Sequence, residues 1–291
     1  MATERIDPRA HIGAVHLTVS SLPASIAFYA ERLGFRVAGN ESNVARLGAG
    51  GADLLVLHED RAAPRPHRTT GLFHFAVLMP SRAALADALA RLAATGTPLG
   101  GAADHGVSEA LYLADPEGNG IELYCDRPRS EWPLENGQVQ FVNREIDLDR
   151  LLAGRPGGAP APPTLEPGTT IGHIHLRVSN LDECERFYVG LMGFDRIARL
   201  GHSALFVSAG GYHHHVGLNT WGGVGAPAPP EGALGLRHFV VQLSDTEQCR
   251  RVAERVRAGG VPIREEGGTI RFADPSENRI ALAVSVEPAR V

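Results

Sequence analysis

The stretch GAVHLTV, residues 13–19, recurs three more times as GLFHFAV at 71–77, GHIHLRV at 172–178 and GLRHFVV at 235–241. Each copy reads glycine, two variable residues, histidine, an apolar residue, a variable residue and valine. Polar and apolar residues alternate as they do in a β-strand, and internal repetition decides the architecture before any propensity argument. The repeat predicts four equivalent strands with one histidine each, namely His16, His74, His175 and His238.

A helical stretch with a polar first residue follows each of these strands. Ser81 and Asn180 are residue types that suit the N-cap of a helix. Short β-rich runs, broken by Gly, Pro and Asn turns, follow the helices. The predicted unit is therefore a strand, a helix and about three strands, and the fold class is α+β with four βαβββ units. The predicted helices span residues 21–33, 81–95, 180–192 and 244–258.

A longer repeat pairs the four units into two tandem modules. Phe28 recurs as Phe187 and Asp115 recurs as Asp274, in both cases 159 residues later. Between the modules, the stretch GRPGGAPAPPTLEPG has the Pro, Gly and Ala content of an exposed spacer. We expect a first module over residues 1–150, a linker over 151–168 and a second module over 169–291.

Composition excludes several classes of function. The chain has 291 residues, of which 43% are hydrophobic and 21% charged, as is ordinary for a globular enzyme. A net charge of -5 without long runs of one sign disfavours nucleic acids and anionic membrane surfaces as partners. No apolar run suits a secretion signal or a membrane span, so we expect a cytoplasmic protein. A homo-oligomer is compatible with this composition.

A metal site is indicated by Glu122, which lies among apolar strand residues in NGIELYC. An unpaired carboxylate would be costly there, and a cation is its natural compensation. Two histidines and one carboxylate on neighbouring strands form the facial triad of non-haem Fe(II) sites. The corresponding position of the second module is Ala281, so we expect one metal ion per chain.

The third ligand depends on how the units are paired. His74 and Glu122 belong to the same unit, and the facing wall of the cup must come from another one. His16 completes the triad if the first module forms the cup alone, whereas His175 completes it if halves are exchanged between modules. The histidine cluster at 213–215 favours exchange, because an acid–base residue must face the metal. We expect His74, Glu122 and His175 to bind Fe(II), with Mn(II) or another divalent ion as an alternative and His16 as the competing third ligand.

A family resemblance follows from these motifs. Four βαβββ units, each opened by a histidine, resemble the vicinal oxygen chelate superfamily of glyoxalases, bleomycin-resistance proteins and extradiol dioxygenases. The segments DHGVSEALYLADPEGNGIELYCDRPRSEWP, GHIHLRVSNL and SALFVSAGGYHHHVGLN resemble the two-module catechol 2,3-dioxygenase proteins of bacteria. The resemblance covers nearly the whole chain. It implies an extradiol ring-cleaving enzyme that acts on a small aromatic diol with Fe(II) and dioxygen.

Three further residues are assigned roles in proton handling. We expect His214 to be the acid–base residue, because HHHVGL resembles the strand with the pocket histidine of extradiol enzymes. His213 or His215 would take this role if the register differed by one residue. Tyr112, ten residues before Glu122, matches the tyrosine that hydrogen-bonds a substrate oxygen in this family. His105 is expected to hydrogen-bond the metal-bound phenolate or a peroxo oxygen.

Two other functions compete with ring cleavage. A glyoxalase-type isomerase would need a fourth ligand, normally a carboxylate on the last strand of the partner unit, where this chain has histidines and aliphatic residues. A metal-free protein that binds small molecules, as bleomycin-resistance relatives do, would have an apolar cleft without an assembled triad. Metal analysis separates this last function from the other two.

Overall fold

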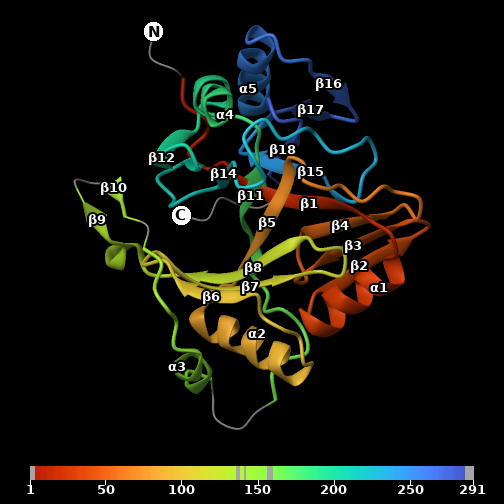
Figure 1. The fold of residues 1–291 in the computed structure, drawn as a ribbon, viewed down its shortest axis with the longest axis vertical. Helices are drawn as coiled ribbons and strands as arrows, with labels where there is room; N and C mark the ends of the chain where they lie inside the picture. Colours follow the sequence, from red (N-terminus) through yellow and green to blue (C-terminus); the bar gives the residue numbers. More distant parts are fainter. Residues whose placement is uncertain (1–3, 136–137, 141, 156–159, 286–291) are drawn as a thin grey trace. The chain divides into compact units, whose positions relative to one another are not determined.

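The computed structural model describes residues 4–135, 138–140, 142–155 and 160–285 (Figure 1). Residues 156–159 of the expected linker lie outside these ranges. Among the described residues, no helix is both long and apolar enough to cross a membrane. The three cysteines are buried and none forms a disulfide.

All four predicted helices are present. Two of them begin as α-helix and end as π-helix: α1 (Leu22–Ala27) continues through Phe28–Arg32, and α4 (Leu181–Glu185) continues through Arg186–Met192. The other two are α2 (Arg82–Ala94) and α5 (Thr246–Ala258). The predicted N-caps are confirmed, since the side chains of Ser81 and Asn180 accept hydrogen bonds from the first-turn backbone. A further short helix, α3 (Leu148–Ala153), runs across the expected start of the linker.

The strands form two eight-stranded sheets and one small hairpin. The first sheet has the order β16-β17-β18-β15-β1-β4-β3-β2 and so combines strands of the fourth and first units. Its strands are β1 (His11–Val19), β2 (Arg36–Glu41), β3 (Val44–Gly48), β4 (Asp53–Glu59), β15 (Gly235–Leu243), β16 (Arg264–Glu266), β17 (Thr269–Ala273) and β18 (Arg279–Val284).

The second sheet has the order β12-β13-β14-β11-β5-β8-β7-β6 and combines strands of the third and second units. This pairing is the exchanged arrangement, and the α+β class with four βαβββ units is confirmed. Its strands are β5 (Gly71–Leu78), β6 (Gly101–Asp104), β7 (Ser108–Ala114), β8 (Gly120–Asp126), β11 (Thr170–Arg177), β12 (Asp195–Leu200), β13 (Ala204–Ser208) and β14 (Val216–Asn219). The hairpin is β9 (Leu134–Glu135) with β10 (Gln138–Val139).

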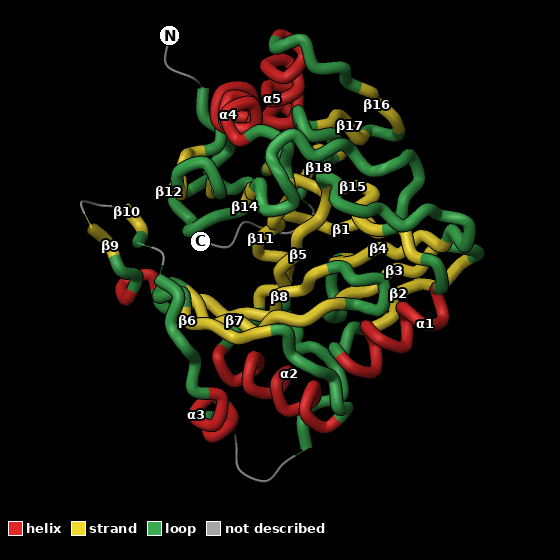
Figure 2. The backbone as a smooth tube through the Cα atoms, in the orientation of Figure 1, coloured by secondary structure: helices red, strands yellow, loops and turns green. Residues whose placement is uncertain are grey.

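The chain also divides into two compact units, which differ from the four βαβββ units. Each compact unit is built from segments that are not consecutive in the sequence. One comprises residues 1–16, 64–73 and 172–291, and the other comprises 17–63 and 74–171. In the latter, α2 covers one face of β6, β7 and β8 (Figure 2). Its residues Leu85, Leu89 and Leu92 are buried. In the former, α5 packs its Val252 and Val256 in the core beside β15 and β18. The expected boundaries at 150 and 168 stay a prediction.

The 159-residue repeat has a structural cause in a buried tyrosine and aspartate. The Tyr29 hydroxyl donates a 2.7 Å hydrogen bond to Asp115, and the Tyr188 hydroxyl donates a 3.0 Å bond to Asp274. Each aspartate also accepts backbone N–H groups of the turn that follows it. Burial raises the pKa of both aspartates, which these hydrogen bonds oppose. The repeated residues therefore hold the turn before the last strand of each module.

Candidate metal centre

His74 and Glu122 are brought together by two parallel strands. In the register of β5 and β8, Ala76 lies opposite Glu122, and His74 shares the face of Ala76 because side chains alternate along a strand. The Nε2 atom of His74 lies 3.1 Å from a carboxylate oxygen of Glu122. Two ligand atoms at about 2.1 Å from one ion and at a right angle would be about 3.0 Å apart. The spacing therefore suits two neighbouring ligands of one metal ion.

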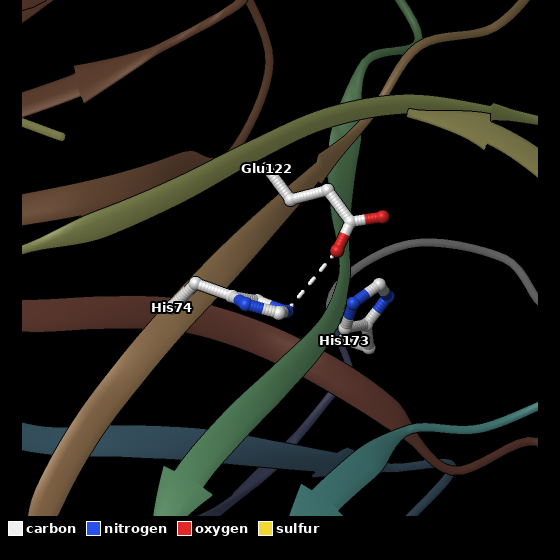
Figure 3. Close-up of side chains that lie close together, drawn as sticks. All are labelled: His74, Glu122 and His173. Atoms are coloured by element: carbon white, nitrogen blue, oxygen red, sulfur yellow. Dashed lines mark ion pairs between the residues drawn. The ribbon is translucent and has the colours of Figure 1, made fainter. Parts of the chain in front are cut away.

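His173 of β11 completes a group of three buried donors. One ligand atom from each of His74, Glu122 and His173 lies within 4.8 Å of the other two (Figure 3). The exposed fractions of the three residues are only 7%, 3% and 1%. Two imidazole nitrogens and a carboxylate suit a divalent transition metal, and burying a carboxylate favours a cation beside it. The residues present therefore fit a divalent metal ion.

The histidine in this group is His173, whereas the sequence repeat selected His175. Both residues lie on one face of β11, two positions apart, so strand alternation alone does not separate them. The ring of His175 lies over Gly217 of β14, where a Cβ atom would come within 2.9 Å of the imidazole. It also contacts the rings of Phe206 and Trp221, with centroids 5.7 and 5.5 Å away. His175 is thus packed in an aromatic cluster beside the candidate ligand.

The competing third ligand, His16, is placed elsewhere. Its ring stacks on that of His238, with centroids 3.9 Å apart and planes 21° apart. Both residues belong to strands of the first sheet, whereas the three donors above belong to strands of the second. Among the described residues, no further group of three or more His, Cys, Asp or Glu side chains has the spacing of a metal site.

Tyr112 lies directly opposite Glu122 in the antiparallel pairing of β7 and β8. Its hydroxyl is 2.7 Å from Nε2 of His105, and it also hydrogen-bonds the Glu122 carboxylate. Burial and the neighbouring carboxylate raise the pKa of Tyr112 above its usual value, so the phenol keeps its proton. The backbone carbonyl of Val142 lies 3.0 Å from Nδ1 of His105 and can only accept, so that Nδ1 carries a hydrogen. The single hydroxyl hydrogen of Tyr112 thus has two acceptors within reach.

His214 lies in the turn before β14 and not on the strand where the sequence pattern places it. Its ring lies 4.1 Å from the ring of His173, measured between centroids. Its Nδ1 atom is 2.8 Å from Nδ1 of His213, so one of these two atoms carries the hydrogen of a hydrogen bond. His214 therefore contacts a candidate ligand from within the same compact unit, and His213 orients it.

His215 has a different environment from its two neighbours. Its Nδ1 atom accepts a hydrogen bond from the backbone N–H of Ala209 at 3.1 Å and lies 2.9 Å from the Ser208 hydroxyl. Burial, followed by the nearby histidines, lowers the pKa of His215 to about 3. His215 is thus a neutral, hydrogen-bonded structural residue, and the acid–base candidates narrow to His213 and His214.

Comparison with known proteins places this chain in a family. The model of the Glyoxalase/Bleomycin resistance protein/Dioxygenase superfamily matches residues 10–123 and 170–282. A protein of Bacillus subtilis (strain 168) named catechol-2,3-dioxygenase is 45% identical over 270 residues, which cover 91% of this chain and 94% of that protein.

Two solved structures show the same fold at low sequence identity. One, from Bacillus subtilis subsp. subtilis str. 168, has a TM-score of 0.65 at 16% identity and covers 98% of this chain and 87% of its own. The other, glyoxalase I from Zea mays, has a TM-score of 0.58 at 14% identity, with coverages of 94% and 92%. The resemblance predicted from the sequence is confirmed, and the chain belongs to the Glyoxalase/Bleomycin resistance protein/Dioxygenase superfamily.

Proposed function

We propose that this chain is an extradiol dioxygenase that cleaves catechol-type rings with dioxygen and one Fe(II) held by His74, Glu122 and His173. The observation that carries the proposal is the buried group of two imidazoles and one carboxylate. Such a triad occupies one face of a metal ion and leaves the opposite face for substrate and dioxygen. The 45% identical relative named catechol-2,3-dioxygenase supports this reaction over others in the superfamily. Mn(II) would compete for the same ligands.

The metal, when bound, would supply the redox chemistry through which dioxygen reacts with the diol. The residues around it bind and orient the diol. Tyr112 is suited to donate a hydrogen bond to a substrate oxygen, because its desolvated phenol stays protonated. Its present acceptors, His105 and Glu122, hold the hydroxyl in position until a substrate oxygen replaces one of them. His105 then acts through Tyr112, and its contact with Val142 fixes the direction of its ring.

His214 is the proposed acid–base residue, since a diol must lose a proton to bind through both oxygens. The hydrogen bond with His213 occupies Nδ1 of His214, so that proton exchange with the substrate would run through Nε2. The contact between the rings of His214 and His173 puts this group beside a proposed ligand. His214 would therefore act next to the metal, where the diol oxygens are expected to bind.

An isomerase of the glyoxalase type is less well supported. That chemistry looks for a fourth ligand, and the group of donors found among the described residues has three members, one of them a carboxylate. The last strand of the partner unit, β14, offers only Val216, Gly217, Leu218 and Asn219. A three-ligand site agrees better with the binding of a diol and dioxygen on the same ion.

Anaerobic reconstitution tests the proposal. The protein would be loaded with Fe(II), freed of excess metal, and mixed with a series of catechols in air-saturated buffer. We expect one dioxygen consumed per catechol, measured with an oxygen electrode, together with the visible absorbance of a ring-fission product. Glu122→Ala is the matched control and should give neither signal. Stable Fe(II) binding without oxygen uptake for any catechol would contradict the proposal.

A further inference from the structure

The segments that precede β1 and β11 are two copies of one structural motif. Ile6-Asp7-Pro8 recurs as Leu165-Glu166-Pro167 at the same 159-residue offset as the rest of the repeat. We call residues 4–8 the first strap and residues 160–168 the second strap. The side chains of Ile6 and Leu165 are 4% and 2% exposed, so each strap buries one apolar anchor. The second strap belongs to the expected spacer, yet it is packed against the protein.

Both straps make the same backbone contact. The Leu165 N–H donates a 2.7 Å hydrogen bond to the carbonyl of Gly34, and the Ile6 N–H donates a 2.9 Å bond to the carbonyl of Gly193. These glycines follow the two π-helical segments and have φ angles of +82° and +89°. Residues with a Cβ atom rarely adopt such angles. At Gly193 a Cβ atom would lie 2.6 Å from the carbonyl oxygen of Glu4. The close approach of the strap therefore explains why glycine stands there.

One arginine on the neighbouring helix secures each strap. Arg91 of α2 donates to the carbonyls of Leu33 and Pro162, at 2.9 and 2.6 Å, so it joins the strap to the end of the π-helix. Arg255 of α5 donates to the carbonyl of Met192 at 2.9 Å, and its guanidinium lies 3.4 Å from the Glu4 carboxylate. Helix, π-helix end and strap are thus linked by the same residue type in both compact units.

The two straps differ in their further contacts. A hollow of about 360 Å³ opens between the second strap and α2, lined by Met79, Ala84, Pro162 and Leu165 among others. The first strap is instead tied further by Asp7, whose carboxylate accepts the backbone N–H of Ser244 at 2.9 Å. Beside this hollow, the hydrogen bonds from Arg91 to the carbonyls of Leu33 and Pro162 hold the second strap to α2.

We propose that the second strap is a positioning element for the metal centre: Leu165 and Arg91 fix where β11 begins and so place His173, eight residues after Leu165. The inference rests on the proposed role of His173 as a ligand. The first strap places β1 in the same way, but Ala14 stands at the position that corresponds to His173. The two straps are therefore alike in structure and differ in what they position. Arg91 is a positioning residue, since it acts through the backbone of the strap.

This asymmetry supplies a matched pair of variants, Leu165→Ala and Ile6→Ala. Each removes one buried aliphatic anchor at the equivalent position. Hydrogen exchange of the metal-free proteins should show about tenfold faster exchange at the start of β11 for Leu165→Ala and at the start of β1 for Ile6→Ala. Titration with Mn(II), followed by electron paramagnetic resonance, should show about tenfold weaker binding for Leu165→Ala. Ile6→Ala should bind Mn(II) within about twofold of the unaltered protein.

Equal loss of Mn(II) affinity in both variants would overturn the inference, because it would reflect general destabilisation. Faster exchange confined to residues 160–168, with β11 unchanged, would overturn it as well. If the unaltered protein binds no Mn(II), the proposed function fails, while the exchange data still decide whether the strap orders β11. Should Leu165→Ala not fold, Arg91→Lys against Arg255→Lys makes the same comparison, because lysine keeps the charge and loses the forked hydrogen bonds.

Discussion

Replacing Tyr112 by phenylalanine removes one hydroxyl and leaves the three proposed metal ligands unchanged. The hydroxyl is 2.7 Å from His105 and also bonds Glu122, so it is held beside the proposed metal before substrate arrives. A hydrogen bond to a charged group is worth about 1.5–3 kcal/mol. If this bond is made fully to the substrate oxygen in the transition state, its loss lowers kcat/KM by about 10- to 160-fold. Metal content should stay at the level of the unaltered protein.

The assay is steady-state cleavage of a catechol by the Fe(II)-loaded protein, with the double variant Tyr112→Phe/His105→Ala measured beside the two single ones. If His105 acts through Tyr112, both substitutions remove the same interaction. The double variant should then be only slightly slower than the slower of the two single variants. The corresponding coupling free energy between the two residues is about 1 kcal/mol. Tyr29→Phe is the control, because it also removes a tyrosine hydroxyl bonded to a carboxylate, that of Asp115, at 2.7 Å. It should lower stability and leave kcat/KM nearly unchanged.

Two results would refute this reasoning. Strictly additive effects of Tyr112→Phe and His105→Ala would show that the 2.7 Å hydrogen bond has no part in the reaction. Loss of the metal in Tyr112→Phe would show that the hydroxyl supports Glu122 rather than the substrate.

Three further outcomes follow from the same geometry. His214→Ala should retain the metal and lose about a hundredfold or more in kcat, the usual scale for a positioned acid–base group, and His213→Ala should lose less because it only orients His214. Glu122→Ala should bind no Fe(II) in a chelator-competition assay, since two imidazoles remain from a three-ligand shell. His215 has a pKa of about 3 when folded, against about 6.5 when unfolded, so its contribution to stability is present above pH 6.5 and is lost as the pH falls toward 3. In denaturant titrations, His215→Asn should therefore lose about 2 kcal/mol less stability between pH 7 and pH 5 than the unaltered protein, and an equal loss would contradict the assigned ionisation.

The units of the fold could be predicted because their signals are local and repeated. Four copies of a seven-residue strand pattern, followed by helices with suitable caps, decide the α+β class without any knowledge of long-range contacts. The histidine cluster at 213–215 favours the exchanged pairing of the units on chemical rather than structural grounds. The π-helical ends at Phe28–Arg32 and Arg186–Met192 lie within the predicted helices and differ from them in hydrogen-bond pattern, which the apolar periodicity of the sequence does not reveal.

Sequence periodicity does not distinguish the two histidines of β11 that are candidates for the third metal ligand. His173 and His175 share one face of β11. The repeat selects His175, because the histidine of the repeated pattern stands three residues after its glycine, here Gly172. The ring of His175 lies over Gly217, whose missing side chain leaves room for it, and that contact joins β11 to β14. His214 was expected on a strand, but β14 begins two residues later. The roles of Tyr112 and His105 were assigned separately, and the 2.7 Å hydrogen bond now links them.

For the expected linker at 151–168, the amino-acid composition does not reveal which residues of the segment make contacts. Proline, glycine and alanine are typical of exposed linkers, and this part of the prediction rests on composition alone. In the structure, Arg155 pairs with Asp87 of α2 at 2.7 Å, and Leu165 is buried. The residues that hold the segment, Asp87 and Arg91, lie one turn apart on α2, more than sixty residues earlier in the chain. Only the three-dimensional arrangement reveals that contact.

Metal analysis of two single variants, His173→Ala and His175→Ala, tests the central claim most directly. Both proteins would be reconstituted with Fe(II) under anaerobic conditions, desalted, and assayed for bound iron by mass spectrometry. We expect about one iron per chain in the unaltered protein and in His175→Ala, and almost none in His173→Ala, because His173 is the one residue within the described ranges that joins His74 and Glu122 within 4.8 Å. Iron retained by His173→Ala and lost from His175→Ala would contradict it.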